Sequence, residues 1–290
     1  MRMTSRAAVN GIEIAYETFG RPGDRPLLLI MGLGSQMILW DEELCEMFAA
    51  RGHHVVRFDN RDVGLSTHLD GTPVPDLAAV AAGTAAPPYT LEDMAEDAAG
   101  LIDALGWDSA HVVGASMGGM IAQVLAIAHP GKVRTLTSIM STTGPNVGQP
   151  TEAAMGALMR PPVQDREAAV ESALAVWSVI GSPGYPMDPE KIARTAALAY
   201  DRAYDPAGST RQLLAIFAAE DRTQALGRLS IPALVIHGEA DPLVQLSGGK
   251  ATAEAIPGAR LITFPGMGHD LPRPLWERIV DEVSALTAAA

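Results

Sequence analysis

The chain has 290 residues, of which 48% are hydrophobic, a formal net charge of −13 and a sequence pI of about 4.9. This length and apolar content suffice for a full hydrophobic core, and the acidic excess argues against nucleic acids and anionic membranes as partners. The single cysteine, Cys45, excludes an intrachain disulfide, and the apolar runs are far shorter than the roughly 20 residues of a membrane span.

The N-terminal half alternates short apolar runs with helical patterns. Met1–Asn10 carries no apolar core of a signal peptide, so we expect a cytoplasmic protein. Ala7–Thr18 alternates apolar and polar residues around Asn10-Gly11, which predicts an antiparallel hairpin at the edge of a sheet. The following predicted elements are strands at Pro26–Met31 and His54–Phe58, helices at Asp41–Arg51 and Leu91–Leu105, and a long surface loop at Gly71–Pro88. This alternation predicts βαβ units and a mostly parallel sheet.

The alternation breaks after a strand predicted at Val133–Met140. From Thr142 to about Gly227 the patterns are helical only, at Thr151–Met159, Asp165–Ile180, Asp188–Tyr204 and Thr210–Thr223. The α/β pattern returns with strands at Ala233–Gly238 and Arg260–Phe264 and helices near Gly249–Ala255 and at Leu275–Thr287. We therefore predict an α/β core made of residues 1–143 and 228–290, with a helical cap of residues 144–227 inserted over the sheet.

The segment Gly114–Gly118, with the sequence GASMG, follows an apolar run and precedes a helical pattern at Met120–His129. A G-x-S-x-G pattern between a strand and a helix is typical of a nucleophile elbow, which holds a serine on a strained turn with its oxygen exposed. The two glycines are expected because strand and helix pass too close for a Cβ. A surface turn is the alternative reading of the same letters, and this context disfavours it.

A nucleophilic serine needs a base, and the base needs an acid that orients it. Of the seven histidines, only His269 lies in a loop directly after a late strand, whereas His53, His54 and His111 begin strands at the opposite edge. Asp241 directly follows the preceding strand, and ligands of parallel sheets collect at the carboxyl ends of strands. We therefore predict Ser116, His269 and Asp241 as a catalytic triad. Glu239 is the competing acid, and Asp270 is disfavoured because it is adjacent to the histidine.

The tetrahedral intermediate of such a serine needs two N–H donors. The residue after the nucleophile, Met117, is predicted to supply one, and Leu33, in the loop after the first parallel strand, is predicted to supply the other.

Four segments together resemble the serine α/β-hydrolases, and within them most closely the aclacinomycin methylesterase branch, whose members are carboxylesterases acting on a polyketide methyl ester. The segments are Met31–Gly34, Phe58–Ser66, Gly114–Gly119 and Pro265–His269. The resemblance covers the chain outside Thr142–Gly227. It implies the α/β-hydrolase fold, the same triad and oxyanion donors, and neither a metal nor an organic cofactor. Many α/β-hydrolases have His-Gly where this chain has Met31-Gly32, and many have glycine at the position of Asp62.

The Asp59–Asp62 segment carries two carboxylates that could suggest a metal site, but we interpret it as structural, with Arg61 paired to a neighbouring carboxylate. The 13 methionines suit either an apolar pocket of irregular shape or ordinary core filling. The predicted substrate-binding residues are Gly32, Trp40, Met155, Met159 and Trp177.

These features predict a serine carboxylic-ester hydrolase that forms an acyl-enzyme on a hydrophobic, possibly bulky small-molecule ester. The resemblance suggests a methyl ester of a bulky polyketide-like acid, or a macrolactone. The same triad also serves C–C bond hydrolysis and perhydrolysis, and a non-catalytic receptor that retains the pocket is a third reading. A homodimer is left open by the sequence.

Overall fold

The computed structural model describes residues 3–290. Met1 and Arg2 lie outside the described residues, and so does that part of the prediction that Met1–Asn10 is not a signal peptide. An eight-stranded sheet has the order β1-β2-β4-β3-β5-β6-β7-β8. The first two strands pair antiparallel, as do β2 and β4, and every later pair is parallel. The strands are β1 Ser5–Val9, β2 Ile12–Phe19, β3 Arg25–Ile30, β4 His53–Phe58, β5 Ala110–Ala115, β6 Val133–Ile139, β7 Ala233–Gly238 and β8 Arg260–Phe264.

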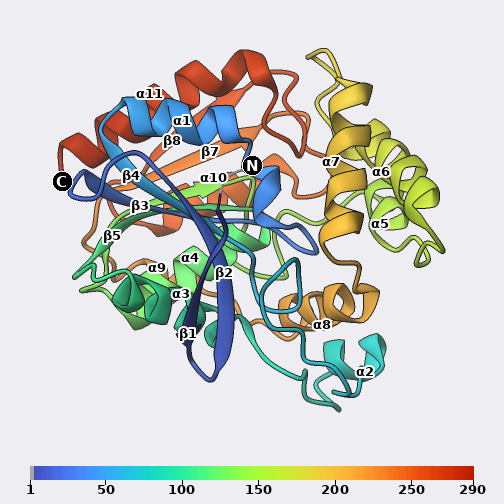
Figure 1. Cartoon of the computed structure of the whole chain (residues 1–290). Helices are drawn as coiled ribbons and strands as arrows, with labels where there is room; N and C mark the ends of the chain where they lie inside the picture. The colour runs from blue at the N-terminus through green and yellow to red at the C-terminus, as the bar shows by residue number, and fades with distance from the viewer. Residues whose placement is uncertain (1–2) are drawn as a thin grey trace.

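Helices cover both faces of the sheet (Figure 1). The helices α1 (Glu42–Ala50) and α11 (Trp276–Ala288) cover one face, and α3 (Leu91–Ala104), α4 (Met117–Ala128) and α10 (Leu246–Ala255) cover the other. Side chains of β3 alternate between the two layers: Leu28 joins one buried cluster and Leu29 the other. This explains the continuous apolar run of the predicted strand, because a strand covered on both faces buries every side chain.

The predicted hairpin is confirmed, and its turn explains its sequence. Asn10 and Gly11 both have positive φ, at 45° and 77°, as a two-residue type I′ turn requires. The predicted loop at Gly71–Pro88 differs from the structure, because it contains the short helix α2 (Leu77–Ala81). The Asp76 side chain accepts the Ala79 N–H and thereby starts that helix, a local capping signal within a Pro- and Gly-rich segment.

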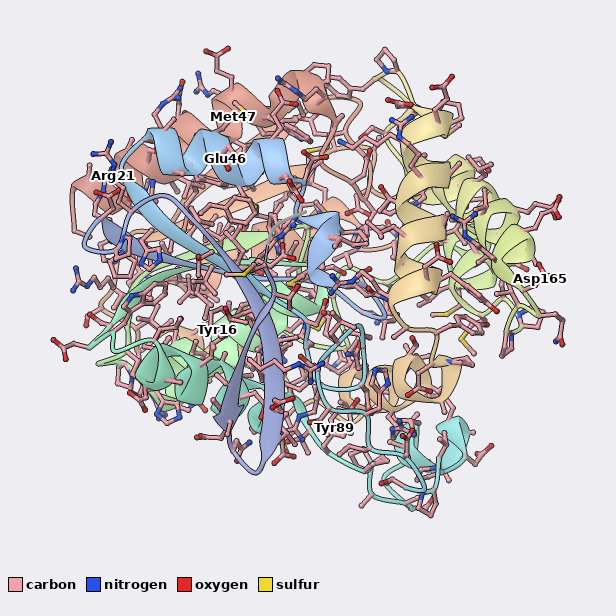
Figure 2. The ribbon with its side chains drawn as sticks, in the orientation of Figure 1. Tyr16, Arg21, Glu46, Met47, Tyr89 and Asp165 are labelled. Carbon is pink, nitrogen blue, oxygen red and sulfur yellow. The ribbon has the colours of Figure 1, made fainter. Side chains whose placement is uncertain are left out.

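Four helices fill the region predicted as a cap (Figure 1), and Figure 2 shows their side chains as sticks. They are α5 (Glu152–Leu158), α6 (Arg166–Ile180), α7 (Pro189–Arg202) and α8 (Pro206–Phe217), followed by the short α9 (Thr223–Leu226). Asp165, whose carboxylate caps α6, lies at the outer end of this group in Figure 2. The helix predicted at Thr210 begins earlier, because Asp205 caps it and Pro206 occupies its first turn. The boundaries at 144 and 227 stay predictions.

Two short 3-10 helices, Met37–Leu39 and Arg273–Leu275, complete the elements. In the described part of the chain, none of the helices has both the length and the apolar content needed to cross a membrane.

Candidate active site

Ser116 occupies a strained turn between β5 and α4. Its backbone lies at φ 56° and ψ −123°, a conformation that L residues rarely adopt, and its N–H donates to Ile139 O at 2.9 Å. A Cβ on Gly114 would lie 2.0 Å from Gly118 O, and one on Gly118 would lie 2.1 Å from Ile30 O. The two glycines are therefore required by close passage of the backbone, as the sequence predicts.

The three residues of the predicted triad lie in one hydrogen-bonded chain. The Ser116 Oγ is 2.9 Å from His269 Nε2, and His269 Nδ1 is 2.8 Å from Asp241 Oδ2. Asp241 is 4% exposed, and its other oxygen, Oδ1, accepts the N–H groups of Leu243 and Val244, both at 2.9 Å. The carboxylate is therefore fixed by its own loop, with one oxygen left for the imidazole.

The two other acids considered for this position have different partners. Glu239 accepts the Thr263 hydroxyl at 2.7 Å, on the neighbouring strand. Asp270 accepts the Ser182 hydroxyl, and burial raises the pKa of its carboxyl. The structure thus brings Asp241 to His269, and Glu239 and Asp270 point elsewhere.

His237, near the end of β7, also contributes to this site and is not among the residues predicted from the sequence. Its Nε2 lies 2.7 Å from Val244 O and 3.7 Å from Asp241 Oδ2. Burial lowers the pKa of this imidazole, so it is neutral and donates its Nε2–H to the Val244 carbonyl. His237 thereby closes the loop that carries Asp241. Its spacing of four residues from Asp241 across a strand end is the signal that could have indicated this.

One predicted oxyanion donor follows the serine in the chain, and the other belongs to the loop whose Gly32 contacts the serine. Met117 is the first residue of α4, where a backbone N–H has no acceptor within the helix. Gly32 lies directly against the nucleophile, since a Cβ built on it would be 3.1 Å from Ser116 Cβ. Leu33 follows it, and among the hydrogen bonds of residues 3–290 none uses the Leu33 N–H. Both N–H groups are free to bind an oxyanion.

The predicted substrate-binding residues have different surroundings. Trp40 is 1% exposed and packs in the core cluster with Leu44 and Phe48, and its role as a pocket residue stays a prediction. Trp40 is buried because the chain turns there into α1, whose apolar side covers the sheet. Met159 ends α5 with 48% of its surface exposed.

Met155 and Trp177 are half-buried on α5 and α6, and both stay predictions as pocket residues. Trp177 packs against the small cluster that includes Ile180 and Leu243. The His269 N–H donates to Ile180 O at 2.7 Å, so the end of α6 contacts the histidine loop directly.

The loop after β4 is held by buried ion pairs, as its structural interpretation predicts. Arg61 Nε and Nη2 each lie 2.6 Å from an oxygen of Asp97 on α3. Asp62 is bound by Arg211 of α8 through two contacts of 2.8 Å. Although burial acts to raise it, these hydrogen bonds from Arg211 hold the pKa of Asp62 below its usual value.

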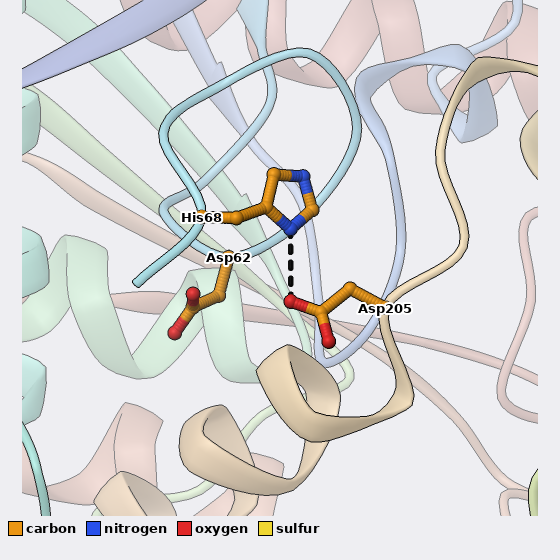
Figure 3. A group of neighbouring side chains, drawn as sticks. All are labelled: Asp62, His68 and Asp205. Atoms are coloured by element: carbon orange, nitrogen blue, oxygen red, sulfur yellow. Dashed lines mark hydrogen bonds and ion pairs between the residues drawn. The ribbon is translucent and has the colours of Figure 1, made fainter. Parts of the chain in front are cut away.

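Figure 3 shows the one group of side chains in residues 3–290 whose spacing could suit a metal ion, formed by Asp62, His68 and Asp205. His68 Nδ1 lies 2.9 Å from Asp205 Oδ2, and the Arg211 guanidinium also contacts that oxygen at 3.2 Å. Arg211 therefore already supplies the positive charge that these two carboxylates require, and the group fits an ion-pair network better than a metal site.

A family model for the alpha/beta hydrolase fold matches residues 25–272. The chain belongs to this family. Rhodomycin D methylesterase DauP of Streptomyces sp. (strain C5) is 30% identical to it over 294 residues, which cover 94% of each chain. The bifunctional esterase/perhydrolase DCH of Acinetobacter calcoaceticus is 25% identical over 285 residues, 95% of this chain and 96% of that protein. The chain is thus an esterase-type alpha/beta hydrolase, resembling the methylesterases.

Among solved structures, an enol-lactonase from Burkholderia xenovorans LB400 superposes with a TM-score of 0.74. It is 23% identical and covers 98% of this chain and 100% of its own. The likeness shows that the two proteins share the fold.

Proposed function

We propose that this protein is a serine carboxylic-ester hydrolase that works through an acyl-enzyme. The observation that carries the proposal is the chain of contacts from Ser116 through His269 to Asp241, at 2.9 and 2.8 Å, with the serine on a strained turn. A nucleophile, a base in contact with it and an acid that orients the base are the groups that acyl transfer requires.

In the first half of the reaction, His269 Nε2 accepts the Ser116 proton as Oγ attacks the ester carbonyl. Asp241 keeps the other ring nitrogen protonated and stabilises the imidazolium that forms. The N–H groups of Leu33 and Met117 bind the oxyanion, and His269 then protonates the leaving alcohol. In the second half, His269 removes a proton from water, which attacks the acyl-enzyme and releases the acid and free Ser116.

We propose a hydrophobic small-molecule ester as the substrate, with a bulky acyl group and a small alcohol such as methanol, or a lactone in which both are joined. The support is the methylesterase relative, together with the apolar helices α5 and α6 beside the Asp241 and His269 loops.

The test is turnover of methyl esters of increasing acyl size by wild type and Ser116→Ala. Ser178→Ala is the matched control, because Ser178 is exposed on α6 and its hydroxyl bonds only within its own helix, to Ala175 O at 2.8 Å. We expect turnover in wild type and Ser178→Ala, and a loss of about 10⁶-fold in kcat for Ser116→Ala. Equal turnover in all three proteins would refute the proposal.

Perhydrolysis is a second candidate, because a relative of 25% identity carries both activities. The same acyl-enzyme would be attacked by hydrogen peroxide in place of water and would release a peracid. An assay of peracid formation from a carboxylic acid and hydrogen peroxide separates perhydrolysis from ester hydrolysis, because only perhydrolysis yields the peracid. Binding of esters with thermal stabilisation but no turnover would instead favour the receptor reading.

A further inference from the structure

One of the side chains that hold the turn carrying Leu33 comes from a helix far away in the sequence. Gln212, on α8, is fully buried, and its Oε1 accepts the Gly34 N–H at 2.8 Å. Its Nε2 donates to Arg61 O, also at 2.8 Å. If the amide were flipped, its NH₂ would face the Gly34 N–H and its oxygen would face Arg61 O. The orientation in the structure is therefore the one in which both amide groups and both backbone groups are hydrogen-bonded.

The geometry of the turn leaves the Leu33 N–H open. The Ser35 N–H donates to Gly32 O at 3.2 Å, which closes a four-residue turn over Leu33 and Gly34. Gly34 has a φ of 62°, as a turn with its third residue in the left-handed region requires. The closing bond uses neither of the two central N–H groups. Gln212 binds that of Gly34. Among the hydrogen bonds of residues 3–290 none uses the N–H of Leu33, whose neighbour Gly32 lies against Ser116.

Buried ion pairs fix the residues next to the Gln212 side chain. Arg61, whose carbonyl accepts the amide, is fixed by its buried ion pair with Asp97. Arg211, the neighbour of Gln212 on α8, is fixed by Asp62. A second buried amide, that of Asn60, donates to Met31 O at 2.9 Å and holds the other end of the turn.

We propose that Gln212 is a positioning residue for catalysis: it orients the Gly32–Ser35 turn so that the Leu33 N–H points to the oxyanion formed on Ser116. This inference rests on the proposed ester hydrolysis and adds to it a residue that touches neither substrate nor triad. Removing one oxyanion donor from a serine hydrolase costs about 10²–10³-fold in kcat. Misplacing the donor by loosening its turn is expected to cost about 10–100-fold.

The first variant is Gln212→Met, which keeps the length of the side chain and removes both hydrogen bonds. Gln212→Glu serves as the conservative rescue, because burial favours the neutral acid, whose carbonyl oxygen can accept the Gly34 N–H and whose O–H can donate to Arg61 O. Ser209→Ala is the matched control, one turn earlier on α8: the Ser209 hydroxyl lies beside the turn, 3.1 Å from where a Cβ on Gly34 would be, but bonds to Asp205 O. If Gln212→Met does not fold, Gln212→Asn replaces it, because its amide is too short to reach Gly34.

The measurements are kcat, KM and the inhibition constant of a boronic acid, a mimic of the tetrahedral intermediate, on protein that a thermal melt shows to be folded. For Gln212→Met, or Gln212→Asn in its place, we expect kcat to fall about 10–100-fold with KM within about threefold. The boronic acid should bind more weakly by a similar factor, which a general loss of structure would not produce while KM is kept. Gln212→Glu should keep kcat within about fivefold, and Ser209→Ala should match wild type.

Unchanged kcat in Gln212→Met, or in Gln212→Asn where that replaces it, would overturn the inference alone. Equal losses in Gln212→Glu and Gln212→Met would do the same, because the bond to Gly34 would then not be the cause. Absence of Ser116-dependent turnover in wild type would overturn the proposed function, and this inference with it. The two failures are therefore distinguishable.

Discussion

Polar side chains are buried at both ends of the parallel strands. At the carboxyl edge they hydrogen-bond to one another, and at the amino edge each histidine hydrogen-bonds to partners of its own. At the carboxyl edge, Asp241 and His269 have partners on both sides, and loops from the helical region contact them. At the amino edge, His53 binds Phe48 O and Thr287, whereas His111 has a single partner, Thr135, and within residues 3–290 its Nε2 has none.

The difference shows what each edge contributes. Each polar group at the carboxyl edge is held on one side by its neighbours and directed on the other side toward the next member of the triad. Those at the amino edge are held in their neutral form, since burial lowers the pKa of both His53 and His111. Changes at the carboxyl edge should therefore reduce turnover, and changes at the amino edge should alter stability in acid.

The largest effect after loss of the serine is expected for Asp241→Asn. The Leu243 and Val244 N–H groups would keep the amide oxygen, so the amide NH₂ would face His269 Nδ1 and impose the wrong tautomer. We expect kcat for an ester to fall about 10⁴-fold. As a control, the midpoint of thermal unfolding of the variant is measured to show that it is folded. A fall in kcat of less than tenfold would show that Asp241 does not orient the base.

Gly268→Ala tests the contact between the histidine loop and the end of α6. A Cβ there would lie 2.4 Å from Gly181 O and 2.7 Å from Ile180 O, both backbone atoms that cannot yield easily. The loop must move, and a shift of about 1 Å at a catalytic group costs on the order of 100-fold in rate. Gly131→Ala is the control, because a Cβ at Gly131 meets nothing within 4 Å. Equal kcat in the two variants would contradict this role of the contact.

Ser182→Ala should have a smaller effect at the same contact. The Ser182 hydroxyl accepts the Gly268 N–H at 2.8 Å and donates to Asp270. Its removal leaves the loop held by the backbone bond from His269 N–H to Ile180 O. We expect kcat to fall about threefold and the free energy of unfolding to fall by about 1 kcal/mol, measured in urea. A loss as large as that of Gly268→Ala would mean that the hydroxyl, not the backbone, holds the loop.

The smallest effect on turnover, none at neutral pH, is expected for His111→Gln at the amino edge. Burial lowers the pKa of His111 to about 4, below its value in the unfolded chain. The neutral form is therefore favoured by folding, and its contribution is present above about pH 6.5 and lost as the pH falls toward 4.

The wild-type free energy of unfolding should fall over this range, with a share from His111 on the order of 3 kcal/mol. His111→Gln should flatten the fall, as urea unfolding at several pH values would detect. An unchanged slope would show that His111 does not titrate with unfolding.

The parts of the site that could be predicted from sequence have short-range signals. The elbow glycines, the late histidine and the acid after the preceding strand each follow from the local alternation of strand and loop. The placing of His53 and His111 at the amino edge follows from the same alternation and is confirmed.

Other parts could not be predicted, because their partners are far apart in the chain. Gln212 meets Gly34 across 178 positions, and nothing near Gln212 in the sequence distinguishes it from a surface residue of a helix. The burial of Trp40 depends on how α1 packs on the sheet. Both the contact of Gln212 and the burial of Trp40 depend on tertiary contacts, which have no local signal in the sequence.

The most direct test of the central claim is intact mass after treatment with a fluorophosphonate probe, on wild type and on Ser116→Ala. An activated serine in contact with a base reacts with such a probe, and an ordinary serine does not. We predict a single adduct on wild type and none on Ser116→Ala. No adduct on folded wild-type protein, or an equal adduct on the variant, would contradict the assignment of Ser116 as the nucleophile.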